Sequence, residues 1–425
     1  MKRLIISMAL VVIATCACAK KPEYYNYPTS PTDTAPDVSK EVMQTLMDAK
    51  KAGQTLSLGD DITTDLPRIP WQAKAGGPQM FFSDDPEYIR VPEGIAAVEN
   101  VQPGTVRIYQ YNCSQVARLA DGYTSDSKVG TPITRKISLV IENLGKAPLE
   151  LKWKRYSYPE PSKNYHQVAK DGMAGFFDTN KKMPASRTIP VDAMEPLDAN
   201  MEKTLVEYDA LSHAFHEIEI SQPARLYVVQ CDPETNSVDA AKRAAVIESP
   251  KANAGRGLFR LTEYEIENAP GYVIDSARGP VQLMVAEGEI DPWTIGMDTT
   301  KGTFRKPNYS RLAGNYGVLY KCKLKRQSSD GRGLAMLTWN IFKQSMWCGS
   351  SVLVVPQNSK GKFPTGNIPV PSDKLGIQIS PEASILQILP PVPKGKTEEI
   401  DFIFTPPGAC CLPMPILFVP VDWKK

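Results

Sequence analysis

The sequence predicts a mostly β protein, with two tandem Ig-like or fibronectin-like antiparallel β-sandwich domains after a signal peptide and a flexible leader, and a few short helices. Three observations predict this fold. Apolar and charged residues alternate with a period of two in several segments, 37 prolines are spread over 425 residues, and one order of β segments occurs twice. Because proline is excluded from helix interiors and from central ladder positions, so many prolines favour short strands joined by turns.

The composition is that of a globular protein. Hydrophobic residues make up 42% of the chain and charged residues 23%, and the length of 425 residues allows two or three domains. The net charge of +2 gives no electrostatic reason to expect binding to nucleic acid. The sequence has no GxSxG, no Walker loop and no HExxH, so we expect no cofactor, and the motifs name no enzyme class.

The first 19 residues are predicted to be a signal peptide, because a basic start precedes an apolar segment at residues 4–13 and then small residues and cysteines. Two outcomes of processing stay open. Cleavage after Ala19 would give a secreted protein. A lipobox-like context at Cys16 or Cys18 would instead make one of these cysteines a lipidated first residue that anchors the protein to a membrane.

Residues 20–53 are predicted to form a flexible tether with a short helix. The segment 20–36 is polar, rich in proline and without periodicity, which is typical of a linker. Apolar residues between positions 42 and 47 then recur at helical spacing. Ser39 can cap this helix and Gly53 can end it.

Residues 54–250 are predicted to form the first β-sandwich domain. Two amphipathic runs within residues 136–154 flank a turn at residues 143–148, which predicts a half-buried β-hairpin. The alternating segment 216–220 follows, and the proline-led segment PARLYVVQCD at 223–232 completes the unit.

Residues 251–425 are predicted to form the second β-sandwich domain, with the boundary near residues 251–257. A second hairpin is expected at 318–339, followed by the acidic strand 398–404. The segment PMPILFVPVD at 413–422 then matches PARLYVVQCD, which lies 190 residues earlier. We interpret three elements in the same order, at nearly constant offset, as an internal duplication.

Six cysteines lie beyond the leader, and an even number in an exported protein predicts disulfides. They are Cys113, Cys231, Cys322, Cys348, Cys410 and Cys411. Cys113 and Cys231 are the pair expected in the first half, whereas the four in the second half allow three pairings. None has the CxxC spacing of a zinc or redox site.

Two groups of residues are candidate metal ligands. His166, His213 and His216 with Glu217 could hold a transition metal if they converge from loops. If residues 213–217 form a strand, however, His213 and His216 point to opposite faces and are ordinary polar residues of a strand edge.

The second group is Glu287, Glu289 and Asp291, which would share one side of a strand and could hold calcium through oxygen ligands. The same spacing describes the solvent face of an amphipathic strand, which is the interpretation we favour.

Tyr156, Tyr158 and Tyr165 lie among basic residues and are candidate ligand contacts, because such rings stack against sugars or against a partner surface. The structural alternative is that they flank a core position.

From these patterns we expect an exported bacterial cell-envelope or surface protein, lipid-anchored or secreted, at the outer membrane or cell surface or in the periplasm. Its expected role is that of a non-enzymatic binding or structural module that contacts a cell-wall polymer, a glycan or an envelope protein. Two alternatives stay open. One is a secreted hydrolase of surface polysaccharide that uses Glu217, Glu219, Glu287 and Glu289. The other is a metal-binding protein that uses the three histidines.

Overall fold

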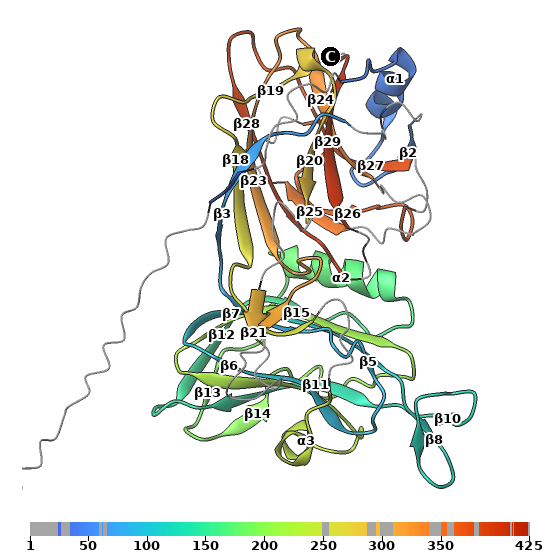
Figure 1. The fold of residues 1–425 in the computed structure, drawn as a ribbon, viewed down its shortest axis with the longest axis vertical. Coiled ribbons are helices and arrows are strands. Elements are labelled where there is room, and N and C mark those ends of the chain that lie inside the picture. Colours follow the sequence, from blue (N-terminus) through green and yellow to red (C-terminus); the bar gives the residue numbers. More distant parts are fainter. Residues whose placement is uncertain are drawn as a thin grey trace, which may run out of the picture.

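The computed structural model describes residues 24–26, 35–58, 62, 66–248, 255–286, 295–297, 309–339, 350–354, 361–377, 382–408, 410 and 412–423. Within these ranges strands predominate, and three α-helices are present: α1 (Lys40–Asp48), α2 (Tyr165–Phe177) and α3 (Ser237–Arg243). The prediction of a mostly β protein is therefore confirmed. The strands form two layered bodies stacked along the long axis of the molecule, with α2 between them (Figure 1).

The lower body in Figure 1, here called the N-sandwich, consists of two sheets. The larger sheet has the order β13 (Arg187–Ile189), β12 (Leu149–Ser157), β15 (Leu211–Ile220), β7 (Gly104–Ser114), β4 (Gln79–Ser83), β17 (Arg256–Phe259), β21 (Ile295–Met297) and β22 (Tyr309–Arg311), with β5 (Tyr88–Ile89) beside β7. The smaller sheet has the order β14 (Met194–Pro196), β11 (Lys136–Asn143), β16 (Ala224–Cys231) and β6 (Gly94–Val101). Apolar side chains of both sheets, such as Ile108 and Leu139, form one core between them.

The upper body, here called the C-sandwich, also has two sheets. The first has the order β1 (Tyr24–Asn26), β3 (Trp71–Gly76), β18 (Glu263–Asn268), β23 (Leu319–Gln327), β28 (Glu398–Thr405), β25 (Ser350–Val354) and β26 (Gly366–Val370), with β19 (Ile274–Asp275) beside β23. The second has the order β2 (Thr55–Ser57), β27 (Glu382–Leu389), β24 (Gly333–Trp339), β29 (Met414–Val421) and β20 (Val281–Val285). A short 3-10 helix spans Ser276–Arg278, and β8 (Ala117–Arg118), β9 (Tyr123–Thr124) and β10 (Thr131–Pro132) form a small arm on the N-sandwich.

Each helix covers the outer face of a sheet with its apolar side. Leu46 of α1 packs in a cluster with Leu337 and Val419, and Ala240 of α3 packs with Val140 and Val229. The predicted short helix and its cap are confirmed, since the Oγ of Ser39 accepts a hydrogen bond from the Val42 amide at 3.2 Å.

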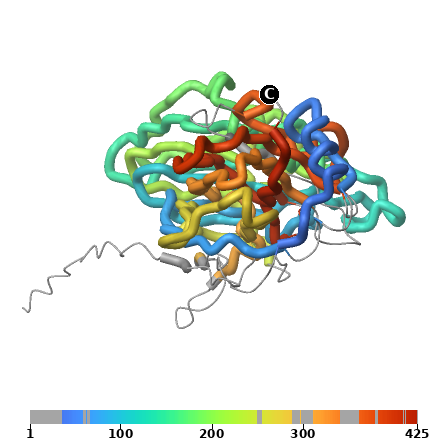
Figure 2. The backbone as a smooth tube through the Cα atoms, turned by 90° about the horizontal axis from the view of Figure 1, so that it is seen from above, coloured from blue at the N-terminus to red at the C-terminus, as the bar shows by residue number. Residues whose placement is uncertain are grey.

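The two sandwiches share one two-stranded ribbon. β3 pairs with β18 in the C-sandwich, and the directly following β4 pairs with β17 in the N-sandwich. The ribbon bends between the bodies, where Gly77 has a φ of 95° and Leu261 a φ of 60°. At Gly77 the bend requires glycine, because a Cβ there would lie 2.5 Å from Cγ of Glu263. Figure 2 shows the orange and red C-terminal strands overlying the green and cyan strands of the N-sandwich.

The strands do not divide at the predicted boundary near residues 251–257. β2 and β3 precede it in sequence but lie in the C-sandwich, whereas β17, β21 and β22 follow it and lie in the N-sandwich. The leader also differs from the expectation of a free tether, because β1 within it pairs with residues 72–74 of β3. The predicted signal peptide, with Cys16 and Cys18, lies outside the described residues.

Both predicted hairpins are wrong. β11 and β12 lie in different sheets, as do β23 and β24, so the turns between them are crossovers from one sheet to the other. Alternation predicts that a strand has one buried face, but it does not identify the neighbour that completes the ladder.

The order of segments recurs in the second half, but the pairing does not. In the first half, the third strand of the match, β15, pairs with the second, β12, and the fourth, β16, pairs with the first, β11. In the second half, the third strand, β28, instead pairs with the first, β23, and the fourth, β29, pairs with the second, β24. The internal match therefore does not extend to the way the strands are joined.

The predicted disulfide between Cys113 and Cys231 is also wrong, because both are buried free thiols. Cys113 packs in the cluster around α2 and Cys231 in the cluster beneath α3, so they belong to opposite outer faces of the N-sandwich. Cys322 is likewise a buried free thiol and Cys410 is buried, whereas Cys348 and Cys411 lie outside the described residues.

Candidate functional site

The junction between the sandwiches is organised around α2. Its apolar residues, which include Val168, Met173 and Phe177, belong to the same core cluster as strands of the C-sandwich. The ring of Phe176 stacks on Phe215 of β15, with the centroids 3.7 Å apart. Asn164 caps the helix by accepting a hydrogen bond from the Gln167 amide at 3.3 Å. α2 is therefore fixed to both bodies.

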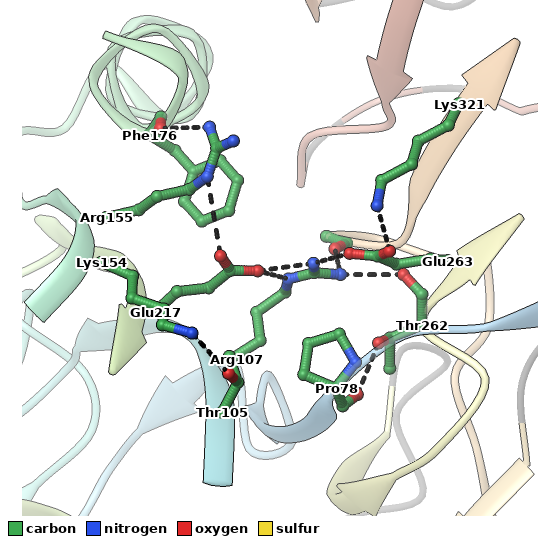
Figure 3. Close-up of polar contacts among 11 residues, drawn as sticks. Pro78, Thr105, Arg107, Lys154, Arg155, Phe176, Glu217, Thr262, Glu263 and Lys321 are labelled. Atoms are coloured by element: carbon green, nitrogen blue, oxygen red, sulfur yellow. Dashed lines mark hydrogen bonds and ion pairs between the residues drawn. The ribbon is translucent and has the colours of Figure 1, made fainter. Parts of the chain in front are cut away.

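A buried ion cluster lies beside α2 (Figure 3). The side chain of Arg107 on β7 is fully buried, and its Nη2 lies 2.6 Å from a carboxylate oxygen of Glu217 and 2.6 Å from one of Glu263. Its Nη1 donates to the Thr262 carbonyl at 2.8 Å. A guanidinium is suited to this position, because its planar fork offers five donors and stays charged when buried.

Two further cations complete the cluster. Arg155 lies 3.6 Å from the second oxygen of Glu217 and sits over the Phe176 ring, and Lys321 pairs with Glu263. Burial alone would raise the pKa of Glu263, but Arg107 and Lys321 hold that pKa below its usual value. Glu263 therefore keeps its charge at neutral pH.

This cluster connects the two bodies at the bend of the shared ribbon. Arg107 and Glu217 belong to the N-sandwich, whereas Glu263 begins β18 of the C-sandwich. The Thr262 hydroxyl donates to the Pro78 carbonyl at 2.6 Å across the bend (Figure 3). Because removal of one member of a buried pair leaves the other uncompensated, the cluster favours one relative orientation of the sandwiches.

A groove runs along the exposed side of α2, where the helix meets β26 and the segment after it. Its first hollow has a volume of about 500 Å³ and is lined by Gln167, Asp171, Pro369 and residues 371–375, among others. Its second hollow has a volume of about 440 Å³ and is lined by residues 174–175 and 177–181 with Gly366 and Asn367. Ala174 lines both, so the two hollows adjoin.

The far wall of the groove is attached to α2 by Lys170. This side chain is 7% exposed, and its Nζ donates to the carbonyls of Pro371 at 2.6 Å, Lys374 at 3.0 Å and Leu375 at 3.3 Å. Asn367 adds a second link, since its Nδ2 donates to the Ala174 carbonyl at 2.6 Å. The groove thus has two walls from segments about 200 residues apart in sequence, held by direct hydrogen bonds.

The histidines predicted as metal ligands do not come together. His213 and His216 lie on β15 and point to opposite faces, as expected for a strand. His213 packs against Tyr109 and Tyr111, whereas His216 stacks on Tyr156 with the centroids 4.8 Å apart.

His166 lies on α2, and Glu217 belongs to the ion cluster. In the part of the chain that the structure describes, no three His, Cys, Asp or Glu residues are arranged to hold a metal ion.

The three tyrosines are not gathered on one surface. Tyr156 is 6% exposed, and its hydroxyl accepts a hydrogen bond from Asn200 at 2.7 Å. The Tyr165 hydroxyl donates to Asp209 at 2.8 Å. Tyr158 is half-buried, and burial raises its pKa to about 12. These contacts are those of packing residues.

Ser157, His216 and Asp198 are close in space but do not form a nucleophilic triad. His216 Nε2 lies 3.5 Å from Asp198, on the face that carries Tyr156. The Oγ of Ser157 points to the other face, where it lies against Gly175 of α2. The imidazole therefore cannot take a proton from that hydroxyl.

The two described acids of the hydrolase alternative, Glu217 and Glu219, are also placed apart from the groove. Glu217 is held by two arginines, and Glu219 pairs with Lys154 at 2.9 Å on the exposed side of the sheet. Glu287, Glu289 and Asp291 lie outside the described residues, and so does the predicted calcium site.

Comparisons with known proteins give no assignment: no family model matches the sequence, and no curated protein matches it significantly. No helix in the described ranges is both long enough and apolar enough to span a membrane.

Proposed function

We propose that this chain is an exported protein of the bacterial cell envelope that works by binding, and that the groove along α2 is its contact surface. The observation that carries the proposal is the construction of the groove. It adjoins a junction locked by buried charges, and Lys170 holds its far wall to α2. A binding surface built on rigid elements loses little conformational entropy when a ligand binds.

The proposed location is supported by the leader, in which a basic start, an apolar segment and Cys16 or Cys18 follow one another. The protein is then lipid-anchored through one of these cysteines, or secreted if cleavage follows Ala19. The Ig-like or fibronectin-like character of the two sandwiches is part of the same proposal and is supported by their mainly antiparallel ladders.

The binding role can be tested with envelope material from the producing bacterium. The mature protein is immobilised and compared with Asp171→Trp, which places an indole in the first hollow from an exposed helix position. Asp239→Trp on the exposed side of α3 is the matched control. We expect the wild type and Asp239→Trp to retain envelope material and Asp171→Trp to lose it. Equal retention by all three, or by none, would contradict the proposal.

A further inference from the structure

We propose that the ligand of this groove is a neutral linear glycan that lies along α2 and occupies both hollows. The inference rests on the proposed function and names its ligand class. The first hollow lies beside the N-terminal part of α2, and the second lies beside its C-terminal end and residues 178–181. Each volume is in the range of small-ligand sites, and their arrangement end to end suits a chain of repeating units.

The lining favours a ligand with many hydroxyl groups. Most of its exposed members carry amides or carboxylates, namely Asn164, Gln167, Asp171, Asp178, Asn180 and Asp373, and the other exposed members are Thr179, Pro369 and Lys374. The one aromatic residue among the described lining residues, Phe177, is 1% exposed and belongs to the core. Protein interfaces are usually anchored by exposed aromatic residues and arginines, which the described lining lacks. Aromatic rings also stack against sugars, so a sugar would be bound here through hydrogen bonds between its hydroxyl groups and the amides and carboxylates.

The polar groups are already held in position. Gln167 Nε2 donates to Asp171 Oδ1 at 2.8 Å, and both oxygens of Asp373 accept hydrogen bonds from Thr55 at 2.8 Å. Each carboxylate keeps free lone pairs, because one carboxylate can accept about four hydrogen bonds. These acceptors can bind sugar hydroxyls without first being ordered.

Asn367 fixes the wall of the groove near the point where the hollows adjoin, because its Nδ2 donates to the Ala174 carbonyl. Its Oδ1 is buried and closed off from the groove, so a ligand would be bound through the exposed amides and carboxylates of the lining.

The charges of the lining favour a neutral chain over a polyanion. Three lysines balance three aspartates, and the ammonium groups are already engaged. Lys170 binds three carbonyls, Lys374 lies in an ion pair with Glu382, and Lys181 sits over the Tyr156 ring. Only Lys170 has all its donors used within the protein, and the remaining Lys181 and Lys374 are outnumbered by the three aspartates, which disfavours phosphate or uronate groups.

The test uses an array of neutral linear oligosaccharides, acidic oligosaccharides and peptides, with the purified mature protein as probe. We expect neutral oligosaccharides to bind the wild type and Asp239→Trp, and not Asp171→Trp. Binding to acidic oligosaccharides or peptides alone would overturn the glycan inference. If no glycan binds but envelope material is still retained through the groove, the glycan inference fails and the proposed function stands. If groove-dependent retention is also lost, both fail.

Occupancy of both hollows is tested by chain length. Asp171→Ala alters the first hollow and Asn180→Ala the second, and both positions are exposed. For oligosaccharides long enough to span the groove, each substitution is expected to weaken binding about threefold to tenfold, as for the loss of one hydrogen bond. The shortest oligosaccharides that bind should respond to only one of the two. Insensitivity of long chains to either substitution would contradict a ligand that lies across both hollows.

Discussion

Replacement of Arg107 by methionine tests the ion cluster at the junction. The substitution keeps an apolar stem of similar length but removes the guanidinium that bonds to Glu217, Glu263 and Thr262. The two carboxylates are then left facing each other across the junction. Their side chains are only 12% and 15% exposed, so water cannot fully solvate them.

The expected loss of stability follows from this burial. Removal of one partner from a buried ion pair costs about 3–5 kcal/mol, because the remaining charge is uncompensated. Arg155 and Lys321 still neutralise part of the charge, so we expect a value within that range and not above it. The double variant Arg107→Met with Glu217→Gln should recover part of the loss, since it removes one of the stranded charges.

The assay is urea unfolding at pH 7, followed both by tryptophan fluorescence and by far-UV circular dichroism. Lys154→Met is the matched control, because Lys154 forms an exposed pair with Glu219 and its loss should leave the midpoint unchanged. Arg107 connects the sandwiches, so its loss should also separate the two probes into distinct transitions. If Arg107→Met unfolds at the same urea concentration as Lys154→Met, our interpretation of the cluster is wrong.

Three further predictions follow from buried groups. Burial lowers the pKa of His213 to about 4, whereas an unfolded histidine titrates near 6.5. Between these two values the unfolded state binds a proton that the folded state does not. The free energy of unfolding should therefore fall by about 1.4 kcal/mol for each pH unit as the pH is lowered from 6.5 to 4. His213→Gln should remove that contribution from urea unfolding measured across this window, and an unchanged slope would contradict it. Lys170→Met should speed hydrogen exchange in residues 371–375, and unaltered protection there would show that the Nζ contacts do not hold the loop. Cys113 and Cys231 should resist a thiol reagent in the native protein and react after denaturation without reductant, whereas a lack of reaction after denaturation would indicate a disulfide.

The features that the sequence predicted correctly depend on local pattern. Ser39 caps α1 because a short hydroxyl side chain before a helix can reach the first free amides. His213 and His216 lie on opposite faces because three positions along a strand reverse the side-chain direction. Such relations need only neighbours in the chain.

The features that it missed depend on which distant segments meet. Alternation identified the core face of β11 and β12, but β11 is also buried on its other face, where Val140 packs beneath α3. The ladder partners of the two strands lie up to 95 residues away in sequence. No sequence motif singles out Arg107, and its burial follows from packing against β18 and α2. The groove was missed because it brings α2 together with residues 366–375, which are distant in sequence. The disulfide was predicted wrongly because an even number of cysteines does not show to which face of a sheet each one points.

The most direct test of the central claim is hydrogen exchange, measured by mass spectrometry, of the mature protein with and without isolated envelope polymer. If the protein works by contact through the groove, amides in residues 164–181 and 366–375 should gain protection while the projecting arm at residues 117–132 stays unchanged. Protection of the arm alone, or of no segment under conditions where the polymer is retained, would contradict the claim.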